Sequence, residues 1–264
     1  MQLSDQVKEK AAAGTFHIRK GGDGEESGFR TRDIYRFFAV DVIIVIILKL
    51  LLGLGFFPTL DAHVLAVLAG RVILFCYLAW LIRERRNAWR EAGGATAGRG
   101  WAWPLSLAVY AAGYPLILWA DRLNIALLRQ IHASFGEVFV PTPQNIITLI
   151  FEDILASPIR AILVAFTVLI GPFMEELAFR GMGLDAFRRS AGPVRAIFWT
   201  SLLFGLYHFS LQMLIPLSLL GAIFAAARLL SRSLWCAVAV HSLHNCFTLA
   251  VTAHALGRLD FPAW

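Results

Sequence analysis

Charged residues are scarce in this sequence of 264 residues. Aspartate, glutamate, lysine and arginine together make up 16% of it, and hydrophobic residues make up 58%. A typical soluble domain carries about 25% charged residues, so this composition excludes a disordered chain and a typical soluble enzyme. The apolar residues gather in long uncharged runs, and in lipid such runs must form helices. The predicted fold class is all-α, a polytopic transmembrane bundle of about seven or eight spanning helices.

Cysteine is also rare. Cys76, Cys236 and Cys246 lie in apolar stretches and form no Cys-x-x-Cys pair, so neither a disulfide framework nor a thiolate zinc site is expected. The His-Glu-x-x-His motif of zinc peptidases is absent as well. The net charge of +6 comes mostly from residues that flank apolar runs. Lipid headgroups therefore explain the positive charge, and no nucleic-acid partner is expected.

The chain divides into a polar, flexible N-terminal arm, residues 1–32, and a helical membrane domain, residues 33–264. The long run from 145 splits into a short amphipathic piece and a spanning helix near 159–183. We expect residues 121–144 to lie along the membrane interface. The apolar runs are roughly 34–57, 60–82, 101–120, 145–179, 194–210, 211–230 and 233–256.

Arginine residues predict the orientation. With the arm in the cytoplasm, seven spans place the arginine-rich loop 83–99 and the turn near Arg188 and Arg195 on that same side. The opposite loops, 57–62 and 121–158, are poor in lysine and arginine. We therefore expect a multi-pass integral protein of the bacterial inner (plasma) membrane with a cytoplasmic N-terminus.

Ionisable residues inside spanning segments mark the candidate site. Each costs about 2.5–3.5 kcal/mol on insertion scales, so each needs a reason. Arg71, midway along the second run, is expected to be structural or to snorkel. The others fall in three motifs, GPFMEELAFRG with Glu175, Glu176 and Arg180, FGLYHF with His208, and HSLHNCF with His241, His244 and Asn245.

The two adjacent glutamates are expected to differ. Glu176 and Arg180 are four residues apart and can pair on one helix face. Glu175 is rotated by about 100° from Glu176 and has no cation of its own on that helix. A carboxylate in that position makes sense if it faces a wet cavity and does acid–base work.

Sequence spacing predicts that the three motifs meet. Glu175, His208 and Asn245 each lie 13 residues from the arginine nearest one helix end, which is roughly 20 Å along a helix. His241 lies about one turn nearer that end. Gly192-Pro193 forms a tight turn, so the first two motif helices should be antiparallel neighbours.

A carboxylate and an imidazole beside one water can activate it, and a second imidazole and an amide can stabilise an oxyanion. These are the parts for hydrolysis of a peptide bond within the membrane. The preferred interpretation requires no cofactor. Alternatively, Glu175, His208 and His241 could hold a divalent metal such as zinc, because all three residue types are zinc ligands.

The ordered motifs resemble those of the CPBP family, the CAAX-processing and bacteriocin-processing intramembrane endopeptidases. The resemblance covers about residues 160–250, and Glu-Glu-x-x-x-Arg, Phe-x-x-x-His and His-x-x-x-Asn carry it. It implies that Glu175 is the catalytic base, that His208 helps to activate the water, and that His241 and Asn245 form the oxyanion site. It further implies that Glu176 and Arg180 support the local structure and that the partner is a membrane-tethered protein or peptide substrate.

Two other functions stay open at this point. Glutamate and histidine in spanning helices also form proton relays, so a proton-coupled membrane transporter is one alternative. A non-catalytic membrane protein of the immunity or chaperone type on the same scaffold is the other.

Overall fold

The computed structural model describes residues 28–94, 98, 100–135, 150–151 and 155–258. Every regular element within these ranges is a helix. Most of the predicted N-terminal arm, residues 1–27, lies outside the described part, as does most of the predicted amphipathic piece before residue 157. The helices before the first motif are α2 (Thr31–Gly53), α3 (Leu60–Glu84), α4 (Arg86–Glu91) and α5 (Ala102–Phe135).

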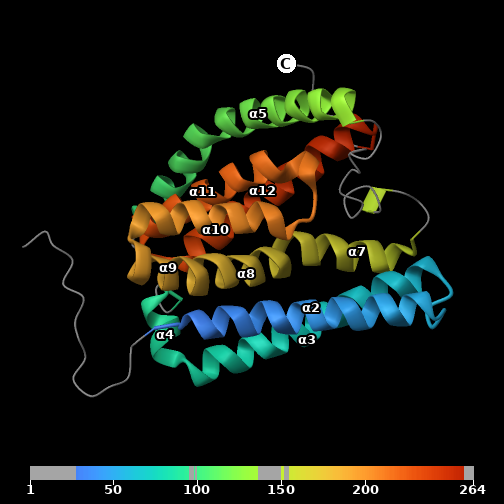
Figure 1. The fold of residues 1–264 in the computed structure, drawn as a ribbon, viewed down its shortest axis with the longest axis horizontal. Helices are drawn as coiled ribbons and strands as arrows, with labels where there is room; N and C mark the ends of the chain where they lie inside the picture. Colours follow the sequence, from blue (N-terminus) through green and yellow to red (C-terminus); the bar gives the residue numbers. More distant parts are fainter. Residues whose placement is uncertain (1–27, 95–97, 99, 136–149, 152–154, 259–264) are drawn as a thin grey trace, which may run out of the picture.

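One long helical rod carries the first motif. It consists of alternating α- and π-helical pieces, which Figure 1 shows as a continuous rod across the molecule. The second and third motifs lie on the helices that follow. The pieces of the rod are α7 (Ser157–Ala165), η2 (Phe166–Ile170), α8 (Gly171–Glu176), η3 (Leu177–Gly183) and α9 (Leu184–Ala191). After it come α10 (Pro193–Tyr207), the short 3-10 turn η4 (Leu211–Met213), α11 (Leu214–Ser231) and α12 (Leu234–Ala255).

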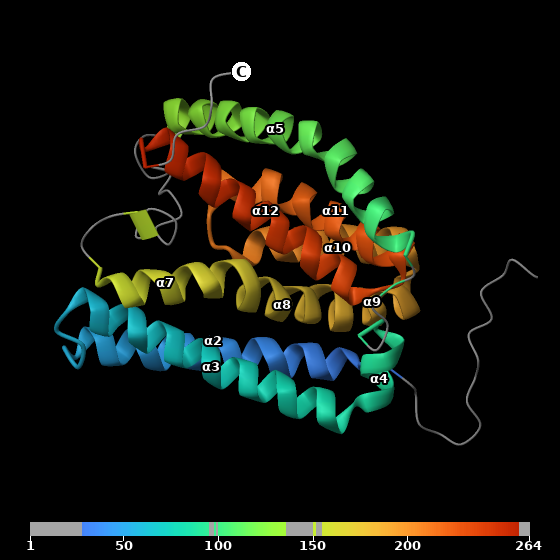
Figure 2. The same cartoon turned by 180° about the vertical axis from the view of Figure 1, so that it is seen from behind.

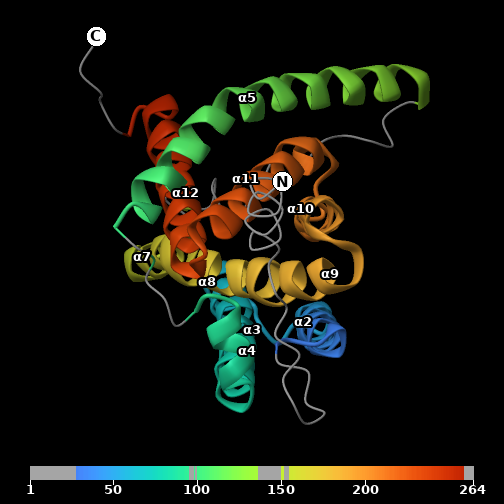
Figure 3. The same cartoon turned by 90° about the vertical axis from the view of Figure 1, so that its left-hand side faces the viewer.

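The helices form layers on either side of this rod. The α2–α3 pair lies along one side of it, and α10, α11 and α12 lie on the other (Figures 1 and 2). Helix α5 arches over α11 and α12 as the outermost element, as the end view in Figure 3 shows. It packs mainly against α11. The rod is therefore enclosed by helices from both halves of the chain, and side chains on it can face two different environments.

Five helical stretches in the described residues are long and apolar enough to cross a membrane, which confirms the polytopic helical bundle. They are Leu60–Glu84, Ala102–Ile131, Ser157–Ala191, Leu211–Ser231 and Leu234–Ala255. The sequence predicted seven or eight. The two further runs do form helices, but α2 carries five charged residues among its 23 and α10 has only 15 residues. A helix of that length reaches about 22 Å, short of the roughly 30 Å hydrocarbon core.

Residues 121–135 do not form a separate interfacial segment, contrary to expectation. They continue α5, which runs unbroken for 34 residues and contains Pro115. Tertiary contacts explain the continuation, because Asn124 Nδ2 donates to the carbonyls of Leu211 and Gln212 at 3.0 and 2.5 Å. The predicted turn before α10 is present. Gly192 adopts φ 82°, which favours glycine, and α9 packs against α10.

The arginine-rich helix ends gather at one end of the molecule, where Figure 1 labels α4 and α9. Arg85 Nη2 lies 3.8 Å from Asp33 Oδ1 at the start of α2, and Arg228 Nη2 donates to the Glu91 carbonyl at 3.4 Å. Arg189 donates to the carbonyl of Phe29, whose side chain is buried. These contacts join the beginning of α2 and the helix α4 to the motif helices.

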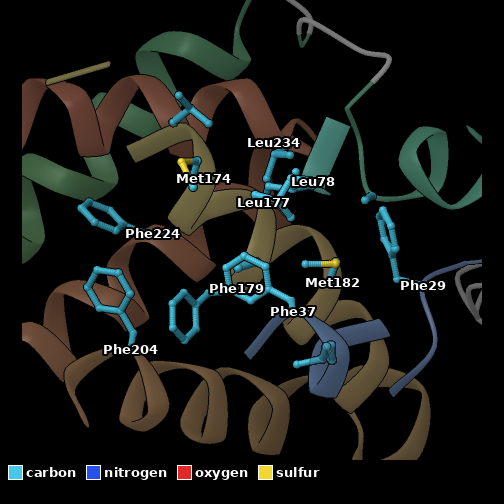
Figure 4. Close-up of a cluster of buried hydrophobic side chains, with 14 of the residues drawn as sticks. Phe29, Phe37, Leu78, Met174, Leu177, Phe179, Met182, Phe204, Phe224 and Leu234 are labelled. Carbon is cyan, nitrogen blue, oxygen red and sulfur yellow. The ribbon is translucent and has the colours of Figure 1, made fainter. Parts of the chain in front are cut away.

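The apolar core lies between the rod and its neighbours. Figure 4 shows Phe179 from the rod beside Phe204 of α10, with Phe224 of α11 next to it. The Phe179 and Phe204 rings meet edge to face at 5.3 Å between centroids. Such pairs stabilise beyond their buried area by about 0.5–1.5 kcal/mol. This cluster also surrounds a buried cation, which the first motif supplies.

Candidate active site

The local backbone of the first motif departs from a regular α-helix. Pro172 has no N–H, and the N–H of Gly171 donates to the carbonyl of Phe166 in the π-helical pattern of η2. The carbonyl of Thr167 would need the N–H of residue 171 in an α-helix or of residue 172 in a π-helix. Neither is available. The carbonyl of Thr167 therefore has no backbone donor within the rod. The side chain of Asn245 on α12 donates to it instead.

Adjacent glutamates on α8 face different surroundings. The side chain of Glu175 is 27% exposed and lines two cavities. The side chain of Glu176 is fully buried. This difference follows from the 100° rotation between neighbouring helical residues. One carboxylate is thus accessible from open space, and the other is available only to protein groups.

A buried ion pair holds Glu176 in place. Arg180 Nη1 donates to Glu176 Oε1 at 3.0 Å, and Arg180 Nη2 donates to the carbonyl of Gly221 at 2.9 Å. The guanidinium also lies over the ring of Phe204, 4.4 Å from its centroid. The pairing predicted between these two residues is therefore present in the structure. Glu176 Oε1 thus accepts from a guanidinium, the strongest cationic donor that a side chain offers.

His241 of α12 joins this pair to Glu175. Its Nδ1 lies 2.9 Å from Glu176 Oε1, and its ring stacks on Phe224 at 4.5 Å between centroids. Because Oε1 also accepts from Arg180, we assign the hydrogen of this contact to Nδ1, and Nε2 faces Glu175. His241 Nε2 lies 3.9 Å from Glu175 Oε2. One imidazole therefore bridges the two neighbouring carboxylates.

His208 approaches Glu175 from α10. It is the C-cap of that helix, and its Nδ1 donates to the carbonyl of Phe204 at 2.8 Å. Its Nε2 lies 3.9 Å from Glu175 Oε2. Helix α10 ends here, near the middle of the long axis in Figure 1, whereas α2 and α3 continue much further. His208 thus lies at the end of its helix, whose last residue, Tyr207, is three residues before the end of the predicted run 194–210.

Three acceptor atoms consequently point at one another. Glu175 Oε2 is buried and has no hydrogen-bond partner among the described residues. With both Nδ1 atoms protonated, the Nε2 atoms of His208 and His241 present lone pairs to it when the rings are neutral. Three unprotonated acceptors at such distances repel one another. A water that donates to two of these atoms, or a proton shared between them, would relieve the repulsion.

Asn245 lies one turn beyond His241 on α12. Its Nδ2 donates to the carbonyl of Thr167 at 2.8 Å, which is the carbonyl left free by Pro172. This bond fixes the orientation of the amide, because only the NH₂ group can donate. One N–H of Nδ2 is used and one remains. Asn245 lines the same cavity as Glu175, His208 and His241.

That cavity, which we call the large cavity, has a volume of about 390 Å³ and lies between the rod, α5, α11 and α12. Its volume is in the range of about 300–1,000 Å³ that ligand sites occupy. Asp121 of α5 and His244 and Thr248 of α12 also line it. Tyr110 of α5 is hydrogen-bonded to His244 Nδ1 at 3.0 Å. His244, which no motif role explained, thus connects α5 to the cavity wall.

A second, small cavity of about 150 Å³ lies on the opposite side of Glu175 and His208, against α2 and α3. Arg71 and Tyr207 line it. Arg71 Nη1 contacts Asp41 Oδ1 at 2.5 Å, and the Tyr207 hydroxyl donates to Asp41 Oδ2 at 2.5 Å. Sequence reasoning missed this cluster, although Asp41 and Arg71 both interrupt apolar runs. Arg71 is therefore paired within the bundle and does not snorkel to the membrane surface.

The alternative of a metal site is not supported by the donor arrangement. No group of three or more histidine, cysteine, aspartate or glutamate side chains in the described part of the chain is placed to hold a metal ion. We therefore derive no step through a metal.

Comparison with known proteins agrees with the motif analysis. Residues 157–247 match the model of a family described as type II CAAX prenyl endopeptidase, Rce1-like. The matched range contains all seven ionisable or amide residues named in the three motifs and confirms the resemblance for this third of the chain. Helices α2, α3 and α5 lie outside it. No curated protein and no solved structure matches the chain.

Proposed function

We propose that this integral membrane protein is an endopeptidase that hydrolyses a peptide bond of a membrane-tethered protein or peptide. The observation that carries the proposal is the position of the Glu175 carboxylate, 3.9 Å from Nε2 of both His208 and His241 at the wall of the large cavity. The family match to endopeptidases supports the same reaction class. Neither a transporter nor a non-catalytic role has an observation of its own in its favour.

Glu175 is the general base in this proposal. A water beside it can donate one hydrogen bond to the carboxylate and the other to His208 Nε2, which accepts because Nδ1 is held by the Phe204 carbonyl. This arrangement orients the water and removes its proton as it attacks the substrate carbonyl carbon. Glu175 then returns the proton to the amine that leaves when the C–N bond breaks. The products are a carboxylic acid and an amine.

His241 and Asn245 stabilise the oxyanion. Asn245 donates through the N–H that Thr167 does not use. His241 donates from Nε2 when the ring is an imidazolium, a state that Glu176 stabilises across Nδ1. With His241 charged, Glu175 and Glu176 balance His241 and Arg180, so the buried cluster is neutral as a whole. Arg180 thereby supports the site without contacting the substrate.

The substrate enters the large cavity, whose wall is mostly apolar, and the small cavity is left beside the other face of Glu175. We also propose that the arginine-rich end of the bundle faces the cytoplasm, as the positive-inside rule requires. The beginning of α2 lies at this end, so the N-terminus is cytoplasmic.

The test compares cells that express the active protein with cells that express the Glu175→Gln variant, using mass spectrometry of membrane proteins. We expect truncated products with the active protein and accumulated precursors with the variant. Glu84→Gln is the matched control, because it removes the same charge from an exposed position at the end of α3. Identical product sets for Glu175→Gln and the active protein would refute the proposal, provided that both are present in the membrane at equal amounts.

A further inference from the structure

Glu175 and His208 are the polar residues of the wall between the two cavities, to which Phe166 and Gly171 also contribute. Both residues line the large cavity on the α5, α11 and α12 side and the small cavity on the α2 and α3 side. The two cavities therefore reach the same pair of side chains from opposite directions. A polypeptide in the large cavity would cover one face of Glu175 and leave the other face open to the small cavity.

The small cavity contains a charged group at the middle of a spanning helix. Arg71 is the twelfth of the 25 residues of α3, and its side chain is 28% exposed. Exposure of a guanidinium to hydrocarbon at this depth is strongly unfavourable, so charged side chains there face a protein interior or a water-filled space. Within the described residues, the hydrogen bonds of Arg71 to Asp41 and Tyr207 are made by Nη1. The donors of Nε and Nη2 are available to water on the cavity side.

The size and chemistry of the small cavity suit water. A volume of about 150 Å³ has room for several molecules, since each occupies about 30 Å³ in the liquid. Cavities that hold water offer it hydrogen-bonding partners, whereas apolar ones stay dry. Arg71, Tyr207, His208 and Glu175 provide such partners here. The cavity is below the size range of typical ligand sites, which argues against a second substrate pocket.

We infer that the small cavity is a water-binding site that supplies the water consumed at Glu175 from the α2–α3 side while the substrate fills the large cavity. This inference rests on the proposed hydrolytic function. One water is used per bond broken: its oxygen bonds to the carbonyl carbon, one proton passes through Glu175 to the leaving amine, and the C–N bond breaks. Asp41, Arg71 and Tyr207 keep the reservoir polar and do not touch the substrate.

Hydration can be measured without any substrate. In a background without Cys76, Cys236 and Cys246, single cysteines replace Leu74, which lines the small cavity, and Ile73, its lipid-facing neighbour at the same depth. A methanethiosulfonate ethylammonium probe reacts with thiolate, which forms only in contact with water. We expect labelling at 74 to be about tenfold faster or more than at 73. Equal rates would overturn the inference.

Water supply is tested by filling the cavity. Ala178 lines it, and Ala178→Leu places three additional carbons there. We expect kcat on the substrate found by mass spectrometry to fall by about tenfold or more while KM changes by less than about twofold. Ala69→Leu adds the same volume on the exposed, lipid-facing side of α3 and serves as the control.

The outcomes separate the two hypotheses. Fast labelling at position 74 together with an unchanged kcat for Ala178→Leu would show that the small cavity is hydrated. It would overturn the inference that this cavity supplies the water used in hydrolysis. Cleavage by Glu175→Gln would remove the hydrolytic proposal, while the labelling result would still decide whether the cavity is hydrated. Ala178→Leu could lose activity only because it misfolds. A second variant, Leu74→Phe, fills the same cavity from α3 and should also lower kcat.

Discussion

Nδ1 of His241 lies 2.9 Å from Oε1 of Glu176, the residue next to the candidate base. This contact assigns the two glutamates to different tasks. Glu176 contacts both the imidazole and Arg180, whereas the ion-pair contacts of Glu175 among the described residues are with the two histidines. In the proposed function, the first motif therefore contains one structural carboxylate, Glu176, and one that acts as the base, Glu175, separated by a single helical step.

Replacement of Glu176 should separate stability from catalysis. Glu176→Met leaves Arg180 as a buried unpaired cation, which we expect to lower the free energy of unfolding by about 3–5 kcal/mol. The double variant Glu176→Met/Arg180→Met should regain most of that loss, because two apolar side chains replace the pair. Turnover should stay low in both, since His241 has lost its Nδ1 acceptor. Denaturant unfolding in detergent and a cleavage assay measure the two effects, and a fully active double variant would contradict the assignment.

Asn245→Ala should affect both folding and turnover. It leaves the Thr167 carbonyl without its donor, at a cost of about 1–3 kcal/mol. It also removes an oxyanion donor, which typically lowers kcat by about 10²- to 10³-fold. Asn124→Ala is the matched control, because Asn124 also satisfies backbone carbonyls but does not line the large cavity. If both variants lose activity in proportion to stability, Asn245 has only a structural role.

Pro172→Ala should lower activity without destabilising the protein. The substitution supplies an N–H to the Thr167 carbonyl, which competes with Asn245 and favours a regular helix through η2 and α8. A π-helical segment holds one more residue per turn than an α-helix. If it becomes α-helical, all later side chains turn about the helix axis by about 100°, which turns Glu175 away from the histidines. We expect a loss of turnover with an unchanged or higher unfolding midpoint. Pro193→Ala at the first turn of α10, where the missing N–H is not needed, should leave turnover as it was.

Metal removal should not abolish cleavage. The described residues contain no group of three or more histidine, cysteine, aspartate or glutamate side chains placed to hold a metal ion. We expect the purified protein to retain its cleavage rate after prolonged treatment with EDTA or 1,10-phenanthroline. Loss of activity that returns on addition of zinc, and not of magnesium, would contradict this expectation.

Several features could be predicted from the sequence because they depend on local geometry. The 100° step between Glu175 and Glu176 predicts different surroundings for them, and the four-residue spacing of Glu176 and Arg180 predicts their pairing. The Gly192-Pro193 dipeptide predicts the turn before α10. The apolar runs predict helices because no other element satisfies backbone groups in lipid. None of these conclusions needs knowledge of which helices are neighbours.

Other features depend on contacts between distant segments, and local patterns do not contain them. The sequence suggests Arg180 as the partner of Glu176 but does not indicate His241, which lies 65 residues away on another helix. From the sequence, the apolar run ends before Asp121. In the structure, α5 continues past Asp121, because Asn124 is hydrogen-bonded to the carbonyls of Leu211 and Gln212, which follow α10. The sequence does not reveal that Asp41, Arg71 and Tyr207 meet. Composition and periodicity thus determined the bundle and the candidate residues. Only the tertiary structure decided that His241 contacts Glu176 and that Asp41, Arg71 and Tyr207 meet, because burial in lipid requires each charge to find a partner without specifying which one.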